Sequence, residues 1–255
     1  MSKSHENVAF QGGGEILIRE RGSATGFRTF GNADSFNFAI NEEKKTQRDY
    51  RDEAGGNAAF SSKITDVTAN INGLSFQADT LAIALRAIVT LVPVTAVVDE
   101  VLELHEDAST PLKNVPDMDK AFTLTAEPTA GNFETLVPGT DYVVKRGVIK
   151  MINYTEAAAG VPAKVSYSTR KSYEINAMAA GAKEYEIFFN GFNSASDGSK
   201  PVTVRVHRVK FSPAQALEWI SDDYGSLAQS FEVLKDESII QADKSQYFKI
   251  QMVQD

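Results

Sequence analysis

The stretch GNADSFNFAINEEKKTQRDYRDEAGGNAAFSSKITDVTANINGLSFQADTLAIALRA, residues 31–87, carries the clearest secondary-structure signals in the chain. Apolar side chains alternate with polar or small ones over 36–40 and again over 67–76, which is the period of half-buried strands. From Ala78 onward the apolar positions follow the spacing of one helical face. Those positions are Leu81, Ala84, Leu85 and Ile88. The stretch therefore predicts a strand, a connection, a long strand and a short helix.

The connection between the two strands, residues 41–57, is long and highly charged. Hairpin loops usually take about two to five residues, whereas residues 42–53 alone hold five acidic and four basic side chains. One interpretation is a solvated loop. The other is an arm that becomes ordered against a partner with the complementary charge pattern. The residues of this candidate contact arm are Lys44, Lys45, Arg48, Asp49, Tyr50, Arg51, Asp52 and Glu53.

This order of elements resembles the major tail tube proteins of long-tailed, siphovirus-like bacteriophages. Near the N-terminus the resemblance is carried by residues 31–36, the charged residues 47–52, the strand through Ile71 and the helix from Ala78 to Arg86. A second block resembles the same family. It comprises residues 188–193, 196–198, 202–211, 213–214, 221–223 and 231–236. The resemblance implies a mainly β fold, a tail-tube-type sandwich or barrel with one short α-helix, and it favours a strand over 215–220.

Length and composition describe an ordinary globular chain. Its 255 residues are enough for one large β domain or two small ones. The net charge of -8 and the pI of about 5.0 argue against a protein that grips nucleic acid. They are compatible with a wall past which DNA slides, because acidic surfaces repel phosphate. The absence of cysteine excludes disulfides, cysteine-zinc sites and thiol catalysis.

The middle of the chain reads as a separate β module. Residues 96–172 hold several short strands punctuated by turn residues, which is typical of a small sandwich. One of these turns, Lys145-Arg146-Gly147, predicts a tight hairpin. The segments 139–142, 147–149 and 165–167 are similar to immunoglobulin-like modules inserted in phage tail proteins. We therefore expect a discontinuous tube domain, 1–95 with 173–255, and an insertion over 96–172. A single continuous β domain is the alternative.

The two ends of the tube domain give further signals. Residues 1–14 read as a flexible arm that ends in three glycines, and a short strand follows at 15–19. Strands are expected over 184–190, 202–211, 226–234 and 247–253, with a phase shift at Val209 that indicates a bulge. The apolar run 81–98 is not expected to span a membrane, because Arg86 and Pro93 interrupt it.

The residues that could support chemistry do not form a recognisable reactive centre. His5, His105 and His207 are isolated in sequence, and no nucleophile elbow is present. Asp117 and Asp119 resemble the start of a calcium loop, but the glycine and the closing glutamate of that motif are missing. The acidic pair 222–223 reads as a solvated turn. We therefore expect no catalytic residue, cofactor or metal site.

The resemblance implies a structural virion protein made in the host cytoplasm. Copies would form rings, by family expectation hexamers, and the rings would stack into a tail tube through which DNA passes without specific binding. Further expected partners are the tape measure, tail terminator and baseplate proteins, and no membrane. The alternatives are another ring-forming tail component, such as a terminator or baseplate ring, a carbohydrate-binding β module that uses Trp219, and, last, a hydrolase.

Overall fold

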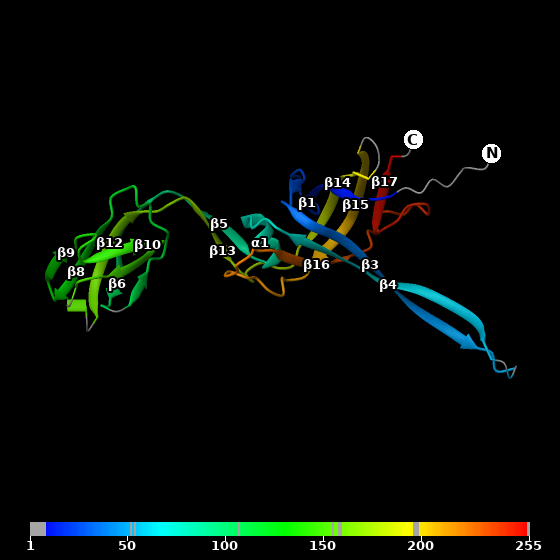
Figure 1. Cartoon of the computed structure of the whole chain (residues 1–255), viewed down its shortest axis with the longest axis horizontal. Helices are drawn as coiled ribbons and strands as arrows, with labels where there is room; N and C mark the ends of the chain where they lie inside the picture. Colours follow the sequence, from blue (N-terminus) through cyan, green and yellow to red (C-terminus); the bar gives the residue numbers. More distant parts are fainter. Residues whose placement is uncertain are drawn as a thin grey trace. The chain divides into compact units, whose positions relative to one another are not determined.

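The protein is mainly β, with antiparallel sheets and one short helix in the described part of the chain (Figure 1). The computed structural model describes residues 9–51, 53, 55–106, 108–154, 156–157, 160–195 and 199–253. Contacts divide the chain into two compact units, one formed by Met1–Ile88 with Ile175–Asp255 and the other by Val89–Glu174. The sequence predicts the corresponding boundaries at 95/96 and 172/173.

The first unit holds one large sheet with the strand order β2-β1-β14-β15-β16-β4-β3, and β17 pairs with β15 off this path. Its strands are β1 (Gly12–Glu20), β2 (Arg28–Thr29), β3 (Ala33–Arg48), β4 (Asn57–Gly73), β14 (Glu184–Asn193), β15 (Lys200–Phe211), β16 (Leu227–Val233) and β17 (Phe248–Met252). The helix is α1 (Ala78–Ala84).

Strand β15 organises this sheet because both of its edges are used. One edge pairs with β14, and the other is shared between β17 and β16. The β14 register shifts between Tyr185 and Ile187, which pair with Val209 and Val206. The β15 side therefore holds one extra residue there, and the predicted bulge is confirmed.

The core of the first unit lies on one face of this sheet. Alternate residues of β4 and β15, such as Ala69, Ile71 and Val206, are buried there. Aromatic side chains of β3 pack against the same cluster: the Phe38 and Phe248 rings are stacked with centroids 4.9 Å apart. A smaller cluster holds α1 against the start of β16. It comprises Leu81, Ala84 and Leu227.

The second unit is a small two-sheet sandwich. Its strands are β6 (Ala96–Leu104), β7 (Ser109–Pro111), β8 (Thr123–Thr129), β9 (Asn132–Thr135), β10 (Tyr142–Lys145), β11 (Val148–Met151) and β12 (Val161–Ser168). The sheets β6-β12-β8-β9 and β10-β11-β7 close over a shared apolar core. Arg146 and Gly147 join β10 to β11 with positive φ angles of 53° and 82°, so the predicted tight hairpin is confirmed.

A short two-stranded pairing marks the place where the chain passes between the units. Strand β5 (Ile88–Val92) leads out of the first unit, and β13 (Ser172–Asn176) returns to it. The two strands pair with each other. The outgoing and returning segments of the chain are therefore neighbours.

Three sequence predictions are wrong. Residues 41–57 are not a long loop, because β3 continues to Arg48 and β4 begins at Asn57. The three glycines at 12–14 are not part of a flexible arm, since they open β1 and pair with β14. No strand forms over 215–220, all of which the structure describes, because that segment forms no backbone pairing with a described strand.

The apolar run 81–98 is divided between α1 and β5. Among the described residues, no helix is long and apolar enough to cross a membrane.

Candidate functional site

Strands β3 and β4 extend together beyond the rest of the sheet. Strand β16 pairs with β4 only from Thr68 to Gly73, whereas the pairing of β3 with β4 continues outward to Arg48 and Asn57. Residues 41–66 therefore form a two-stranded antiparallel extension, which we term the ribbon (Figure 1). A two-stranded hairpin is marginally stable alone in water, and a third strand or a packing partner normally supports it.

The register of the ribbon assigns its side chains to two faces, because neighbouring residues of a strand point to opposite sides. A register shift between Asn41 and Glu42 leaves Thr65 as the extra residue of a bulge. Beyond it, one face carries Glu42, Lys44, Thr46, Phe60, Ser62 and Ile64. The other face carries Glu43, Lys45, Gln47, Ala59, Ser61 and Lys63.

The first of these faces continues the core-facing side of the sheet. Val67 of β4 pairs with Ile40 and is buried at 3% exposure. Farther out on the same face, Ile64 is 48% exposed and Phe60 is 60% exposed. The apolar positions of β4 thus continue beyond the buried core, where their side chains are exposed to solvent. Because it carries the exposed Phe60 and Ile64, we term the face formed by Glu42, Lys44, Thr46, Phe60, Ser62 and Ile64 the apolar face of the ribbon.

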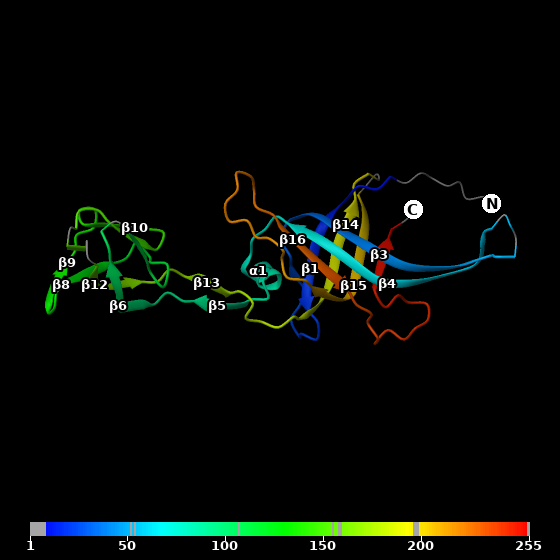
Figure 2. The same cartoon turned by 90° about the horizontal axis from the view of Figure 1, so that it is seen from below.

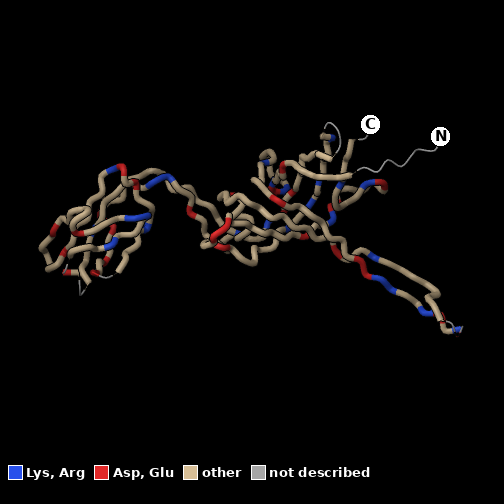
Figure 3. The backbone as a smooth tube through the Cα atoms, viewed as in Figure 1, with Lys and Arg blue, Asp and Glu red and all other residues tan. Residues whose placement is uncertain are grey.

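The second face carries polar or charged side chains at every position except Ala59. The Lys45 ammonium lies 3.5 Å from the Glu43 carboxylate on the same strand. Lys63 stands directly opposite Glu43 on β4. On β3 the acidic pair Glu42 and Glu43 is followed by the basic pair Lys44 and Lys45, so charges of both signs lie along the ribbon (Figure 3). The ion pairs between such side chains are exposed, and each contributes little to stability.

Charge on the apolar face is held in place by local bonds. A hydrogen bond from Ser62, followed by the charge of Lys44, holds the pKa of the Glu42 carboxyl below its usual value. The Lys44 Nζ atom lies 3.5 Å from a Glu42 carboxylate oxygen. Glu42 is therefore ionised at neutral pH, beside the exposed Ile64 that pairs with it.

The bulge at the base of the ribbon is fixed by hydrogen bonds. Asn41 Nδ2 donates to an Asp66 carboxylate oxygen over 2.8 Å, and the Thr65 hydroxyl donates to the other oxygen over 2.9 Å. These two bonds, with Asn41 first, lower the pKa of Asp66. A defined bulge sets the direction in which the ribbon leaves the sheet.

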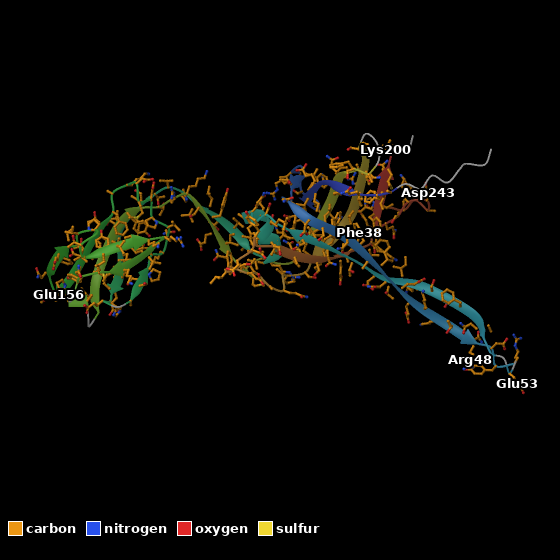
Figure 4. All side chains as sticks on the ribbon, in the orientation of Figure 1. Phe38, Arg48, Glu53, Glu156, Lys200 and Asp243 are labelled. Atoms are coloured by element: carbon orange, nitrogen blue, oxygen red, sulfur yellow. The ribbon has the colours of Figure 1, made fainter. Side chains whose placement is uncertain are left out.

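The tip of the ribbon is a turn that displays an aromatic ring. The Arg51 amide and guanidinium both donate to Asp49, over 2.9 to 3.1 Å, and lower the pKa of that carboxyl. Gly55 and Gly56 have φ angles of 65° and 147°, which favour glycine. Tyr50 lies between the bonded pair and is 86% exposed. Figure 4 shows Arg48 and Glu53 at this end of the ribbon.

The structure thus places the predicted arm residues at two levels. Lys44, Lys45 and Arg48 lie on β3, and Asp49, Tyr50, Arg51 and Glu53 lie in the turn at the tip. Asp52 lies outside the described residues. Sequence reasoning missed Phe60 and Ile64, although Ala58, Phe60, Ser62 and Ile64 alternate with polar or small residues. That alternation was available as a strand signal.

The other candidate residues are not brought together. His105 and Glu103 are exposed neighbours with 3.6 Å between Nε2 and Oε1, and His5 lies outside the described residues. His207 is half-buried on β15; burial first, then Arg205, lowers its pKa. Asp117 accepts a hydrogen bond from the Asp119 amide and lies 3.8 Å from a lysine. Within the described ranges, no group of three or more His, Asp or Glu residues could hold a metal ion.

Comparison with known proteins gives a family without an assigned activity. No curated protein matches the chain. One family matches residues 9–251, which include both units except their outermost ends. The chain belongs to the family described as "Protein of unknown function UCP028589".

Proposed function

We propose that the protein is a structural subunit of a phage tail tube, in which rings of the first unit stack on one another through the ribbon. Its partners would be copies of itself within and between rings, with the tape measure, terminator and baseplate proteins meeting the tube in its lumen or at its ends. The assembled protein would belong to the virion tail. DNA would pass through the tube without being held.

The observation that carries the proposal is the ribbon. Its apolar face leaves Phe60 and Ile64 exposed on a two-stranded hairpin that no other described strand of the sheet supports. Burying such side chains against a partner would supply the support that the hairpin lacks. The acidic and basic side chains on both faces would select one register of contact and disfavour others. A second copy of the chain is the partner that a structural subunit always has available.

Free strand edges support lateral contacts as well. Strand β3 pairs only with β4, and β17 only with β15, within the described chain. Between β3 and the start of β1 lies an apolar hollow of about 620 Å³. Its lining includes Phe10, Phe36, Phe189, Ile250 and Met252. An edge strand beside an apolar hollow is suited to strand addition from a neighbour.

Shortening the ribbon tests the proposal. Glu43 and Lys63 are directly opposite each other, so replacing residues 44–62 with Asn-Gly closes the hairpin early with a two-residue turn. We expect this variant to fold with an unchanged thermal transition and to form no long tubes in negative-stain micrographs. The matched control, Arg146→Asn, gives the β10–β11 turn the same Asn-Gly sequence and is expected to leave tube formation intact.

The outcome separates the candidate functions. Long tubes from the shortened variant would contradict the role of the ribbon. Single closed rings from the wild-type chain would favour a terminator or baseplate ring instead. A wild-type chain that stays monomeric at high concentration and binds glycans would favour the carbohydrate-binding alternative.

A further inference from the structure

We propose that residues 218–224 of one copy dock into a basic hollow of the next copy, and that this hollow lies beyond the C-terminal end of β16. We term residues 218–224 the acidic loop, and the hollow formed by residues 238–249 with His207 the basic hollow. This inference rests on the proposed self-assembly and names a specific contact within it.

The acidic loop displays large apolar side chains to solvent. Trp219 is 75% exposed, Ile220 is 96% exposed and Tyr224 is 100% exposed. Exposed apolar residues scattered singly are ordinary, whereas three within six residues of one loop mark a contact site. Tryptophan and tyrosine are also the side chains most often found as energetic anchors of protein interfaces.

The loop carries negative charge without local compensation. Glu218, Asp222 and Asp223 lie in it, and no lysine or arginine occurs from residue 211 to 234. Among the described residues, none of the three carboxylates forms an ion pair. A partner surface for this loop should therefore combine apolar lining with positive charge.

The basic hollow has that combination. It measures about 560 Å³, and its lining includes His207, Ile239, Ile240, Lys244, Phe248 and Lys249. Neither lysine forms an ion pair with a described carboxylate. Asp243, labelled in Figure 4, also lines the hollow and offsets one of the two lysines. Ile240 is 88% exposed and offers an apolar contact at the rim.

The loop cannot reach the hollow of its own chain. The acidic loop directly precedes β16, and the segment that lines the hollow follows it; the two segments leave opposite ends of this strand (Figure 2). β16 has seven residues, so at about 3.3 Å per residue its ends are roughly 20 Å apart. The segment that lines the hollow is also held in place next to β16, because the Asp236 amide donates a hydrogen bond to the Gln246 carbonyl over 2.9 Å. The loop must therefore meet the hollow of another copy.

The ribbon leaves the sheet at the same end of β16 as the hollow. Thr68 pairs with Glu232 near the end of β16, and residues 41–66 continue outward from there. Gly73 pairs with Leu227 at the other end, next to the acidic loop. A copy positioned to cover the ribbon could also present its acidic loop to the hollow. Because the contact joins two different surfaces, the acidic loop of one copy and the basic hollow of the next, it is heterologous and repeats head to tail.

Charge exchange tests the contact with an intrinsic probe, since Trp219 is the single tryptophan of the chain. We expect its emission to shift to the blue as the wild-type protein assembles. Asp222→Lys with Asp223→Lys, or Lys244→Asp with Lys249→Asp, should each raise the concentration needed for assembly about 10-fold or more, as for like charges brought together. All four changes together should restore assembly. The control, Glu103→Lys with Asp119→Lys, makes the same charge change on the second unit and should assemble normally.

Disulfide trapping gives a second, independent measurement because the chain has no cysteine. Ile220→Cys with Ile240→Cys should give a ladder of disulfide-linked multimers when the assembled protein is oxidised by copper and oxygen. Ile220→Cys with Val98→Cys, in which the second position is also exposed, at 72% against 88% for Ile240, should give none.

Tubes that form with unshifted Trp219 emission, no charge rescue and no ladder would overturn the contact and leave the tube proposal standing. A wild-type chain that never associates would overturn both.

Discussion

Replacing the two exposed apolar residues of the ribbon, Phe60→Ser with Ile64→Ser, should impair assembly without affecting folding. Fully burying a side chain of this size contributes about 1.5–3 kcal/mol. Phe60 is 60% exposed and Ile64 is 48% exposed, so about half of that contribution is still available to a partner. Buried together, the two residues would therefore contribute about 1.5–3 kcal/mol to each contact, which corresponds to roughly a 10- to 150-fold change in affinity.

The assay is the concentration at which wild-type and variant chains sediment as tubes, measured with thermal unfolding on the same samples. We expect the assembly concentration to rise by that factor. The unfolding transition should hardly move, because the changes lie on an exposed surface. The matched control, Ala59→Ser with Gln47→Ser, makes polar changes on the opposite face of the ribbon and should leave both measurements unchanged.

The reasoning fails if the double variant assembles at the wild-type concentration. It also fails if the polar-face control is impaired as strongly as the apolar-face variant, since the ribbon would then act through its shape or its charges and not through its apolar face.

Three further predictions concern stability. Gly14→Ala should destabilise the first unit by about 2–4 kcal/mol in denaturant unfolding, because Gly14 has a φ of 154° and an added Cβ would overlap the Gly191 backbone; a loss below 0.5 kcal/mol would contradict the tight packing. Leu124→Ala should cost the second unit about 2–5 kcal/mol, since Leu124 is 0% exposed, and calorimetry that shows an unchanged transition for this unit would refute it. Two hydrogen bonds from Arg208, of 2.6 and 2.8 Å, lower the pKa of Glu184, so the stability that they add is present above about pH 4.5 and is lost as acid protonates Glu184. Arg208→Gln should therefore reduce the loss of stability that the protein shows on acidification. An unchanged curve of stability against pH would rule this pair out as the cause of that loss.

The parts of the fold that sequence reasoning predicted are those with a clear apolar period. The phase shift at Val209 indicated the bulge, and the turn at Arg146 and Gly147 indicated the β10–β11 hairpin, because one buried face imposes a two-residue repeat. Strand pairs between distant segments, such as β16 with β4, could not be predicted, since pairing partners leave no local pattern in either strand.

The ribbon was misread because its strands have no buried face. Along β3 beyond Ile40 almost every side chain is polar, so the apolar alternation stops although the backbone pairing continues. The prediction for residues 215–220 was wrong in the opposite sense, because a strand was expected where none forms. Trp219 and Ile220 have high strand propensity, but no described strand forms a backbone pairing with them. In both cases the residues are exposed on the isolated chain.

Because β5 pairs with β13, the second unit could be removed or exchanged as a whole. The outgoing and returning segments are hydrogen-bonded neighbours, and paired strands lie about 4.8 Å apart, so a tight turn could join them and omit the sandwich altogether. The same two stubs could accept a foreign domain whose termini are adjacent. Such an exchange would change only the residues between β5 and β13 and would leave the sheet and the ribbon of the first unit as they are.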